Sequence, residues 1–559
     1  MHMQGKLPLP IGRTNYKKIC DNNYYVDKTL LIKDLLDDGT DIILFTRPRR
    51  FGKTLNMDML RTFFEKTAED NSVYFKNKKI WQQGEKYIQH QGKYPVIYLS
   101  LKDIKALNWS SALELLKYLI TTEYARHQEL ATSSLLTSTD ADFYQRIITR
   151  TATEGDYKFS LEALSRMLHM HYKKAPVIII DEYDTPIQEG FLNGYYAEAV
   201  DFIRNFFSAA FKDNPHITLC VLTGILRIAK ESIFSGLNNI QVYSVLQNPF
   251  NQYFGFTTEE VQNIAQYYEK TTKISEIKDW YDGYQFGNTE IYNPWSVLNY
   301  FKFGDPPQPY WVQTSGNNII HEIIRKTDVK TYDDLRKLIT GEAVTSVIDT
   351  NIIYPNLNEP QADIFGFLLM TGYIKATQTT VNEAGATVCQ LSIPNKEIKS
   401  IYKKEILSHF SKAIGSTTLY KLEKALLDKD AAMLKSTLND FLMNTISYYD
   451  DLKENYYHGL LLGLVTILEN NYKLTSNRES GNGRYDIQLA PQEPLLPGII
   501  IEIKVADNPD EAFLKQLAHT ALKQIEEKKY DTELRLQGVD TIYKYGIAFH
   551  NKKVEIVTN

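Results

Sequence analysis

The chain has 559 residues, more than one hydrophobic core usually serves, so two to four domains are expected. Its 43% hydrophobic and 23% charged residues are ordinary for a folded protein and exclude a disordered chain. The 63 basic and 68 acidic residues nearly balance at a net charge of −5, so any surface that binds nucleic acid must be local.

The three cysteines, Cys20, Cys220 and Cys389, lie far apart in the sequence. Their odd number and their spacing argue against both disulfides and zinc, and fit a reducing compartment. The N-terminus lacks the basic-then-apolar pattern of an export signal, and no run approaches eighteen apolar residues. We therefore expect a cytoplasmic protein with no membrane partner.

Residues 1–40 contain one amphipathic helix ahead of the first clear strand. Asp27 is its expected N-cap, and Asp38 with Gly39 is its expected end. Nucleotide-binding folds often place residues that touch the base in such a segment. Packing of the helix on the sheet edge explains the segment equally well.

Residues 42–45 are apolar and run straight into a basic stretch with the spacing of a phosphate-binding loop. The stretch consists of Arg47, Pro48, Arg49, Arg50, Phe51, Gly52, Lys53 and Thr54. In the pattern G-x-x-x-x-G-K-[ST], backbone N–H groups and a helix N-terminus face a polyphosphate, the lysine reaches its β and γ oxygens, and the threonine holds Mg²⁺. Arg47 stands where the first glycine belongs, so a strand followed by a basic surface turn is the alternative.

Three more apolar runs follow at residues 95–101, 175–184 and 217–224, and helical patterns occur at 55–65, 111–127 and 161–172. Strands that are apolar on both faces and alternate with helices indicate a parallel sheet covered on both sides. We therefore predict an α/β fold built on a P-loop NTPase parallel sheet with helices on both faces.

Asp181 and Glu182 follow the apolar residues of the second of these runs. A carboxylate at the C-terminal end of a strand can hold the Mg²⁺ shell, and its neighbour can activate water. Solvated acids at a strand end are the alternative. The next strand ends near Thr223, which we expect to orient the attacking water, and Arg227 or Lys230 beyond it is expected to stabilise γ-phosphate charge. Thr223 and Arg227 also have purely structural explanations.

The phosphate loop, with residues 25–29 before it and residues 180–184 after it, resembles the bacterial AAA-ATPase-like family. Members of that family carry the same arginine in place of the first glycine, and residues 223–239 resemble it too. The family is related to signalling and archaeal-type P-loop ATPases. The resemblance covers about residues 7–300 and implies ATP, Mg²⁺ and a conformational cycle, but no particular substrate.

From about residue 250 the sequence changes to helical patterns with aromatic turns at residues 280–284 and 292–296. Residues 304–309, rich in proline, are the most linker-like break. Residues 320–450 read as mostly helical and carry no recognisable chemistry. We expect a protein partner or a second copy of the chain to bind in this region.

The C-terminal part reads as a small α/β module, with strands at residues 485–489, 499–505 and 545–550 and a helix around 514–525. Residues i and i+2 of a strand share a face, so Glu502 and Lys504 project from the same side. Folding the proline-rich hairpin back brings Asp486 next to Glu502, and two carboxylates that meet repel unless a divalent cation lies between them. Lys504 supplies the cation that a hydrolytic site needs near the attacking water. An ion pair on an edge strand is the alternative.

Asp486 followed by Glu502-Ile503-Lys504 is similar to the core of the PD-(D/E)XK nucleases. Residues 456–463, 483–486 and 524–530 also resemble the nuclease domain that often follows an AAA-ATPase-like domain. The resemblance implies a site in which Asp486, Glu502 and the carbonyl of Ile503 hold Mg²⁺ or Mn²⁺.

The same resemblance implies an acid from a preceding helix, for which Glu454 and Glu469 are both candidates. It also places Gln524 and Tyr530 on a helix that lines the site. Gln524 is alternatively a polar surface residue.

We expect four segments: a P-loop domain (1–250), a helical and aromatic lid extension (251–320), a mainly helical linker domain (321–450) and a restriction-endonuclease-like domain (451–559). Together they predict an ATP-binding and ATP-hydrolysing regulator coupled to a Mg²⁺-dependent nuclease that acts on DNA in defence or DNA processing. The expected catalytic residues are Glu182, Asp486, Glu502 and Lys504.

Two alternatives stay open. The protein is an ATP-driven switch whose nuclease-like domain binds DNA or protein without cutting, or it binds ATP and hardly hydrolyses it because Arg47 and Arg49 hold the product.

Overall fold

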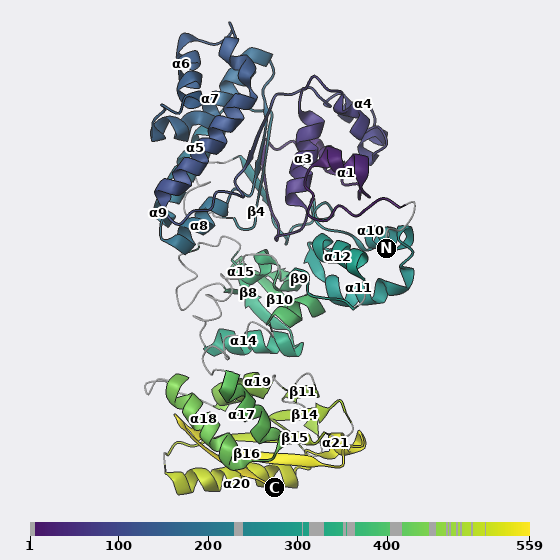
Figure 1. The fold of residues 1–559 in the computed structure, drawn as a ribbon, viewed down its shortest axis with the longest axis vertical. Coiled ribbons are helices and arrows are strands. Elements are labelled where there is room, and N and C mark those ends of the chain that lie inside the picture. The colour runs from purple at the N-terminus through teal and green to yellow at the C-terminus, as the bar shows by residue number, and fades with distance from the viewer. Residues whose placement is uncertain are drawn as a thin grey trace. The chain divides into compact units, whose positions relative to one another are not determined.

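The computed structural model describes residues 6–227, 239–304, 306–311, 329–349, 354, 364–402, 416–445, 454–465, 468, 471–476, 479–480, 483–493, 496–508 and 510–559. The chain forms two compact units (Figure 1). Residues 1–315 and 343–398 make the first unit, and residues 316–342 and 399–559 make the second. The chain therefore crosses between the units three times, after residues 315, 342 and 398. The segments expected at 251–320 and 321–450 are thus each divided between the two units.

The first unit contains the expected parallel sheet. Its strands are β1 (Ile42–Thr46), β2 (Val96–Ser100), β3 (Val177–Asp181), β4 (Leu219–Gly224) and β5 (Ile240–Tyr243). They lie in the order β2-β3-β4-β1-β5, and every neighbouring pair is parallel. Because parallel strands all end at one edge, this order places the ends of β1, β4 and β3 side by side, where ligands bind in open α/β sheets.

Helices cover both faces of this sheet. They are α1 (Tyr16–Asn22), α2 (Leu30–Asp38), α3 (Lys53–Phe64), α4 (Glu85–Ile88), α5 (Trp109–Arg126), α6 (Ser138–Ile148), α7 (Glu154–Tyr172), α8 (Thr185–Asn193) and α9 (Tyr196–Phe211). Figure 1 shows α1, α3 and α4 on one side and α5, α7 and α9 on the other. Every residue of β1, β3 and β4 is buried, as the apolar runs predicted.

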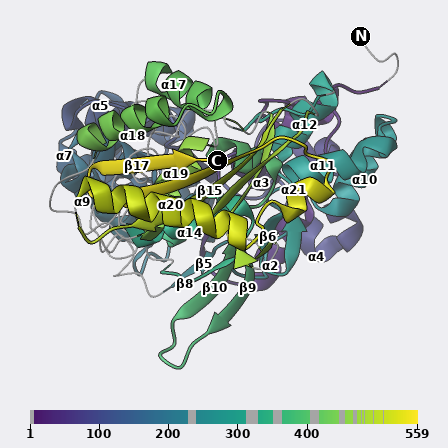
Figure 2. The ribbon, with the colours of Figure 1, turned by 90° about the horizontal axis from the view of Figure 1, so that it is seen from below.

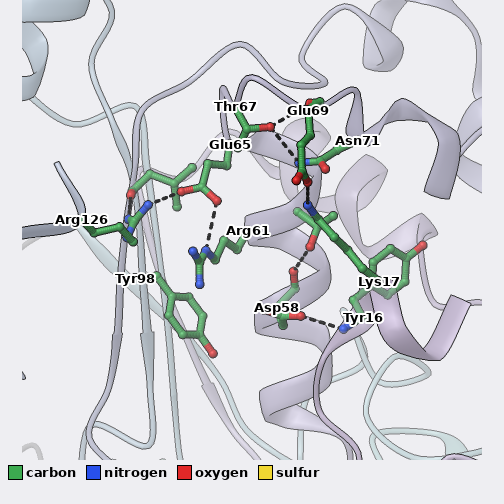
Figure 3. Close-up of polar contacts among 12 residues, drawn as sticks. Tyr16, Lys17, Asp58, Arg61, Glu65, Thr67, Glu69, Asn71, Tyr98 and Arg126 are labelled. Carbon is green, nitrogen blue, oxygen red and sulfur yellow. Dashed lines mark hydrogen bonds and ion pairs between the residues drawn. The ribbon is translucent and has the colours of Figure 1, made fainter. Parts of the chain in front are cut away.

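The carboxyl end of α3 is held by ion pairs, and its amino end carries Lys53. Glu65 accepts a hydrogen bond from Arg61 Nε at 3.1 Å and is also ion-paired with Arg126 of α5 (Figure 3). Asp58 accepts a hydrogen bond from the backbone N–H of Tyr16 at 2.7 Å. These contacts fix the direction of the helix that begins in the phosphate loop.

The expected start of α2 is wrong. Asp27 does not cap this helix, which begins at Leu30 after Thr29. The Asp27 carboxylate instead accepts hydrogen bonds from the backbone N–H and hydroxyl of Thr29, at 2.9 and 2.7 Å. The expected end at Asp38 and Gly39 is confirmed, because Gly39 takes the left-handed conformation at φ 73°.

The rest of the first unit packs beside the sheet. It comprises α10 (Thr258–Tyr267), α11 (Ile274–Tyr281), β6 (Tyr284–Phe286), β7 (Thr289–Ile291), α12 (Pro294–Phe303), β8 (Val344–Val347), α15 (Ile364–Thr371), β9 (Lys375–Val381) and β10 (Thr387–Ser392). Strands β8, β10 and β9 form an antiparallel sheet inside a region read as mostly helical. Strand β9 could not be predicted from the sequence, because the strand is largely exposed and has no apolar alternation.

The second unit is a five-stranded mixed sheet between helices. Its elements are α14 (Val329–Thr340), α17 (Ser416–Leu427), α18 (Ala431–Thr445), α19 (Glu454–Val465), β11 (Tyr472–Ser476), β12 (Glu479–Ser480), β13 (Gly483–Arg484), β14 (Ile487–Pro491), β15 (Gly498–Val505), α20 (Glu511–Glu527), α21 (Thr532–Leu536), β16 (Ile542–His550) and β17 (Lys553–Thr558). The order is β11-β14-β15-β16-β17, and only the β15–β16 pair is parallel.

Alternating residues of β15 face the two helical layers. Ile499, Ile501 and Ile503 pack with α17, α18 and α19. Ile500 lies on the opposite face, which α20 covers (Figure 2). Glu502 and Lys504 continue the α20 face of β15, so the strand carries its charged side chains toward one helix.

No helix among the described residues is both long enough and apolar enough to cross a membrane.

Glu397 is the most deeply buried carboxylate outside the two candidate sites. Its side chain is fully buried, and it accepts hydrogen bonds from the Ser296 hydroxyl and the Trp311 backbone N–H. Burial raises its pKa to about 7 despite these donors.

We predict that Glu397→Gln stabilises the first unit at pH 8. The folded pKa of Glu397 lies above its unfolded value, so its contribution is fully present below about pH 4.5 and is lost as pH rises through about 7. The glutamine removes the buried charge, and we expect a gain of about 1–2 kcal/mol at pH 8 with little change at pH 5. Thermal unfolding at both pH values tests this, with the exposed Glu383→Gln as control. Equal effects at both pH values would contradict it.

Candidate nucleotide and nuclease sites

The phosphate loop connects β1 to α3 at the carboxyl edge of the parallel sheet. Gly52 and Arg50 both take left-handed backbone conformations, at φ 84° and 69°. The Lys53 ammonium is held inside the loop, where it donates to the carbonyls of Arg47 and Pro48 at 3.1 and 3.0 Å. Burial lowers its pKa, and the charge of Glu182 partly offsets this.

Asp181 connects three strands of the sheet through its carboxylate. It accepts hydrogen bonds from the hydroxyl groups of Thr54 and Thr223, each at 2.7 Å. The Ser100 hydroxyl at the end of β2 lies 3.4 Å away. Asp181 is fully buried, and burial raises its pKa. The structure thus brings Thr54 and Asp181, both predicted to hold Mg²⁺, into direct contact.

Thr223 forms hydrogen bonds with both Asp181 and Glu182. Its hydroxyl donates to Asp181 and accepts from the backbone N–H of Glu182 at 3.2 Å. Its hydroxyl proton is therefore used to hold Asp181, which makes Thr223 a positioning residue in this geometry. Glu182 itself has a left-handed backbone at φ 53° and lines the adjoining cavity. Such a strained non-glycine residue is common at functional sites.

Arg47 turns away from the cavity and is fully buried. Its guanidinium donates to the carbonyls of Thr46 and Tyr243 at 2.9 and 2.7 Å and lies 5.3 Å from the ring centres of Phe254 and Phe286. Burial lowers its pKa to about 9. Its backbone does not take the left-handed conformation, which explains why this position accepts arginine in place of glycine.

The other two loop arginines lie at the cavity. Arg49 donates to the Gln188 side chain at 2.9 Å, and the Arg50 guanidinium lies 4.3 Å from the ring centre of Trp295. Arg227 does not line the cavity described here, and its Nε has no hydrogen-bond partner among the described residues. Lys230 lies outside the described residues.

A cavity of about 420 Å³ adjoins the loop. Its lining includes Lys53, Thr54 and Glu182, together with residues 10–14 and 24–26 and Trp295 of α12. The N-terminal segment therefore lies against the cavity, where the sequence suggested base contacts. Asp184 also lines it, and its carboxylate accepts hydrogen bonds from the backbone N–H groups of Ile225 and Leu226.

The second candidate site lies on β14 and β15. Ile487 pairs with Ile501 in antiparallel register, which places Asp486 opposite Glu502. The Asp486 carboxylate accepts a hydrogen bond from the backbone N–H of Ile503 at 2.7 Å. The predicted meeting of these residues at the hairpin therefore occurs.

Glu502 is almost fully buried, and two donors reach one of its oxygens. Lys504 Nζ lies 3.1 Å from Glu502 Oε1, and Gln524 also donates to that atom. Glu502 Oε2 is buried and has no partner among the described residues. Burial, with the nearby Asp486 charge, raises the Glu502 pKa to about 7, while Lys504 opposes this shift.

Gln524 and His458 hold other residues of this site in position. Gln524 donates to both Glu502 and the Tyr530 hydroxyl, the latter at 3.1 Å, so Gln524 is not a free surface residue. His458 on α19 lies with Nε2 3.0 Å from the backbone carbonyl of Asp486. His458 was missed because the contact joins residues 28 positions apart and no local pattern signals it.

The described residues contain no cluster of three histidine, cysteine, aspartate or glutamate side chains that could hold a metal. A metal here would therefore rely on two carboxylates and a backbone carbonyl. The side chain of Glu454 and the whole of Glu469 lie outside the described residues.

Comparison with known families gives one match around each candidate site. Residues 10–234 match the family described as "Predicted AAA-ATPase", and residues 452–559 match the "PD-(D/E)XK nuclease superfamily". The chain carries both domains. A relative from Azotobacter chroococcum mcd 1, described as "Uncharacterized protein in vnfD 5'region", is 25% identical over 573 residues, covering 98% of each chain. The likeness therefore extends through the residues between the AAA-ATPase-like and nuclease-superfamily domains.

We predict that restoring glycine at the first loop position of the AAA-ATPase-like domain harms it. Arg47→Gly leaves the carbonyls of Thr46 and Tyr243 without their donor and opens a void beside Phe254. We expect a loss of about 2 kcal/mol or more in the free energy of unfolding and no gain in nucleotide affinity.

Chemical denaturation tests the Arg47 prediction. The matched control is Arg150→Gly, since Arg150 is exposed and left-handed at φ 58°, so its replacement should change stability by less than about 1 kcal/mol. An Arg47→Gly protein as stable as wild type would contradict the structural role of Arg47.

Proposed function

We propose that the first unit binds and hydrolyses ATP with Mg²⁺. The observation that carries the proposal is the contact between Thr54 and Asp181 beside a lysine held in a phosphate loop. A hydroxyl in the first turn of α3 and a carboxylate at the end of β3 are oxygen donors of the kind that Mg²⁺ prefers. The loop and the N-terminus of α3 offer N–H groups to the phosphates.

Each of these residues has a distinct task. Lys53 leaves the two loop carbonyls to bind β and γ oxygens. Glu182, on the cavity wall, orients and deprotonates the attacking water, while Asp181 stays fixed by Thr223. The segment 10–14 and residues 24–26 are placed to contact the base and ribose.

Lys53→Ala is expected to reduce ATP turnover by at least about 100-fold, because it removes the cation that neutralises γ-phosphate charge. Phosphate release in purified full-length protein measures this. The matched control is the exposed Lys18→Ala, which should retain wild-type turnover. Unchanged turnover in Lys53→Ala would contradict the assignment of the loop, and no turnover in wild type with intact binding would favour a protein that holds ATP without hydrolysing it.

We further propose that the second unit hydrolyses DNA phosphodiesters with Mg²⁺ or Mn²⁺. The supporting observation is the buried Glu502 Oε2, an oxygen without a donor, beside Asp486. A bound divalent cation would satisfy this oxygen and would supply polarisation of the phosphate and a lowered water pKa. Asp486, Glu502 and the Ile503 carbonyl would hold it.

Lys504 and Gln524 prepare this site. Lys504 is paired with Glu502 and stands where it can exchange that partner for the charge developing on a phosphate. Gln524, anchored on Tyr530, keeps the Glu502 carboxylate in place. We infer a cytoplasmic location, in keeping with three cysteines that form no disulfide. We infer DNA as the substrate class.

Lys504→Ala is expected to lower cleavage by about 100-fold or more. The assay uses labelled single-stranded, double-stranded and branched DNA with Mg²⁺ or Mn²⁺, and chelation by EDTA should abolish cleavage. The exposed Lys515→Ala on α20 is the matched control.

One outcome of that assay would favour a binding switch. Cleavage that is equal in wild type and Lys504→Ala would indicate a contaminating nuclease and leave the domain as a module that binds DNA or protein without cutting. The absence of a third described acid at the site is the observation that keeps this second function open. In either case we propose residues 320–450 as the region for a protein partner or a second copy.

A further inference from the structure

Both chain crossings that leave the first unit are tied to one buried carboxylate. The chain leaves after residue 315 and again after residue 398. Trp311, just before the first crossing, donates its backbone N–H to Glu397 Oε1 at 2.8 Å. Glu397, just before the last crossing, also accepts from the Ser296 hydroxyl at 2.8 Å. We call Ser296, Trp311 and Glu397 the exit clamp.

The exit clamp is dry. Ser296 and Glu397 are fully buried, and Trp311 is 5% exposed. Opening such a contact leaves a buried carboxylate without its donors, which costs the full desolvation penalty of the group. The hydrogen bonds of the clamp are therefore either formed or broken, and the clamp residues do not shift gradually between the two arrangements.

The same residues touch the phosphate loop. Trp311 donates its ring N–H to the backbone carbonyl of Arg49 at 3.3 Å. Trp295, adjacent to Ser296, lies under the Arg50 guanidinium at 4.3 Å. Arg49 and Arg50 both line the nucleotide cavity, so a polyphosphate that draws Arg49 acts on a residue bonded to the clamp, and one that draws Arg50 acts on Trp295 beside it.

A third contact supports the connection. A Cβ atom added to Gly372, which follows α15, would lie 3.0 Å from Pro48 Cβ. Gly372 also has a left-handed backbone at φ 87°. The segment that begins at the second crossing and ends at Glu397 thus packs directly on the loop, with no room for a side chain between them.

We propose that the exit clamp couples nucleotide binding at the phosphate loop to the two chain segments that lead into the second unit. The inference rests on the proposed ATP site and adds its regulation. Bound nucleotide fixes Arg49 and Arg50, which hold Trp311 and Trp295 and so keep the clamp closed. The nucleotide state thereby sets how firmly residues 306–311 and 394–398 are anchored.

Hydrogen exchange on the full chain tests the coupling, with and without Mg²⁺ and a non-hydrolysable ATP analogue. We expect exchange of the backbone amides of Gln308, Tyr310, Trp311 and residues 395–398 to slow by about fivefold or more on binding, the lower range of allosteric couplings. Residues 375–381 of the exposed β9 serve as the internal control and should not change.

Thermodynamic linkage between nucleotide binding and closure of the clamp makes the test quantitative. If nucleotide favours the closed clamp by a given factor, breaking the clamp must weaken nucleotide binding by the same factor. Glu397→Ala should therefore raise the dissociation constant of a fluorescent ATP analogue about as much as the analogue slows exchange in wild type. Glu397→Gln, which keeps an acceptor, should restore most of the affinity. Ser296→Ala removes one donor alone, and Glu383→Gln is the matched control.

The outcomes separate this inference from the proposed ATP site. Wild type that binds the analogue without slower exchange at residues 395–398 overturns the coupling and leaves the ATP site standing. Wild type that binds no analogue overturns both. A nucleotide effect on exchange that persists at full size in a folded Glu397→Ala or Ser296→Ala protein also overturns the coupling.

Discussion

The carboxylate of Asp181 is the constraint on which the first site depends. It accepts hydrogen bonds from the hydroxyl groups of Thr54 and Thr223, and so joins the start of α3 to the ends of β3 and β4. This joint exists because β4 lies between β1 and β3 in the parallel sheet. A buried acid without these donors would be costly, and with them it is held in one orientation. The position of Glu182, one residue on, follows from that orientation.

The second site also depends on a buried carboxylate and its hydrogen-bond donors, in a different fold. Glu502 is buried on the face of β15 that α20 covers, and Lys504 with Gln524 satisfies only one of its oxygens. The other oxygen has no donor among the described residues, and burial, together with the charge of the neighbouring Asp486, raises the Glu502 pKa to about 7. A site with an unsatisfied carboxylate oxygen attracts a cation. In both units the fold orients the acidic side chains of the site before any ligand binds.

The sequence could predict what depends on short spacing. The strand before Arg47, the Gly52-Lys53-Thr54 sequence and the alternation around Glu502 each define local geometry, and the parallel sheet and the hairpin follow from them. Boundaries were less certain, as the misplaced cap at Asp27 shows, because a side chain can bond its neighbours in several ways near a helix start.

Long-range contacts could not be predicted. The inward turn of Arg47 depends on Tyr243, Phe254 and Phe286, which lie some two hundred residues away. His458 lies in a stretch that resembles the nuclease domain, and Glu397 lies in one with no recognisable chemistry, but the role of each depends on partners that only the fold brings to it. The expected oligomeric or partner contacts of residues 320–450, and the choice between Glu454 and Glu469, stay predictions.

The proposed ATP site requires Mg²⁺ held by Asp181 and Thr54. Calorimetric titration of ATP into the full chain, with Mg²⁺ and with EDTA, tests it most directly when repeated on Asp181→Asn, which keeps an acceptor for Thr223 but loses the charge. The account predicts that removing Mg²⁺ weakens ATP binding to wild type by about tenfold, or 1.4 kcal/mol, and leaves binding to Asp181→Asn nearly unchanged. Equal Mg²⁺ dependence in both proteins would contradict it.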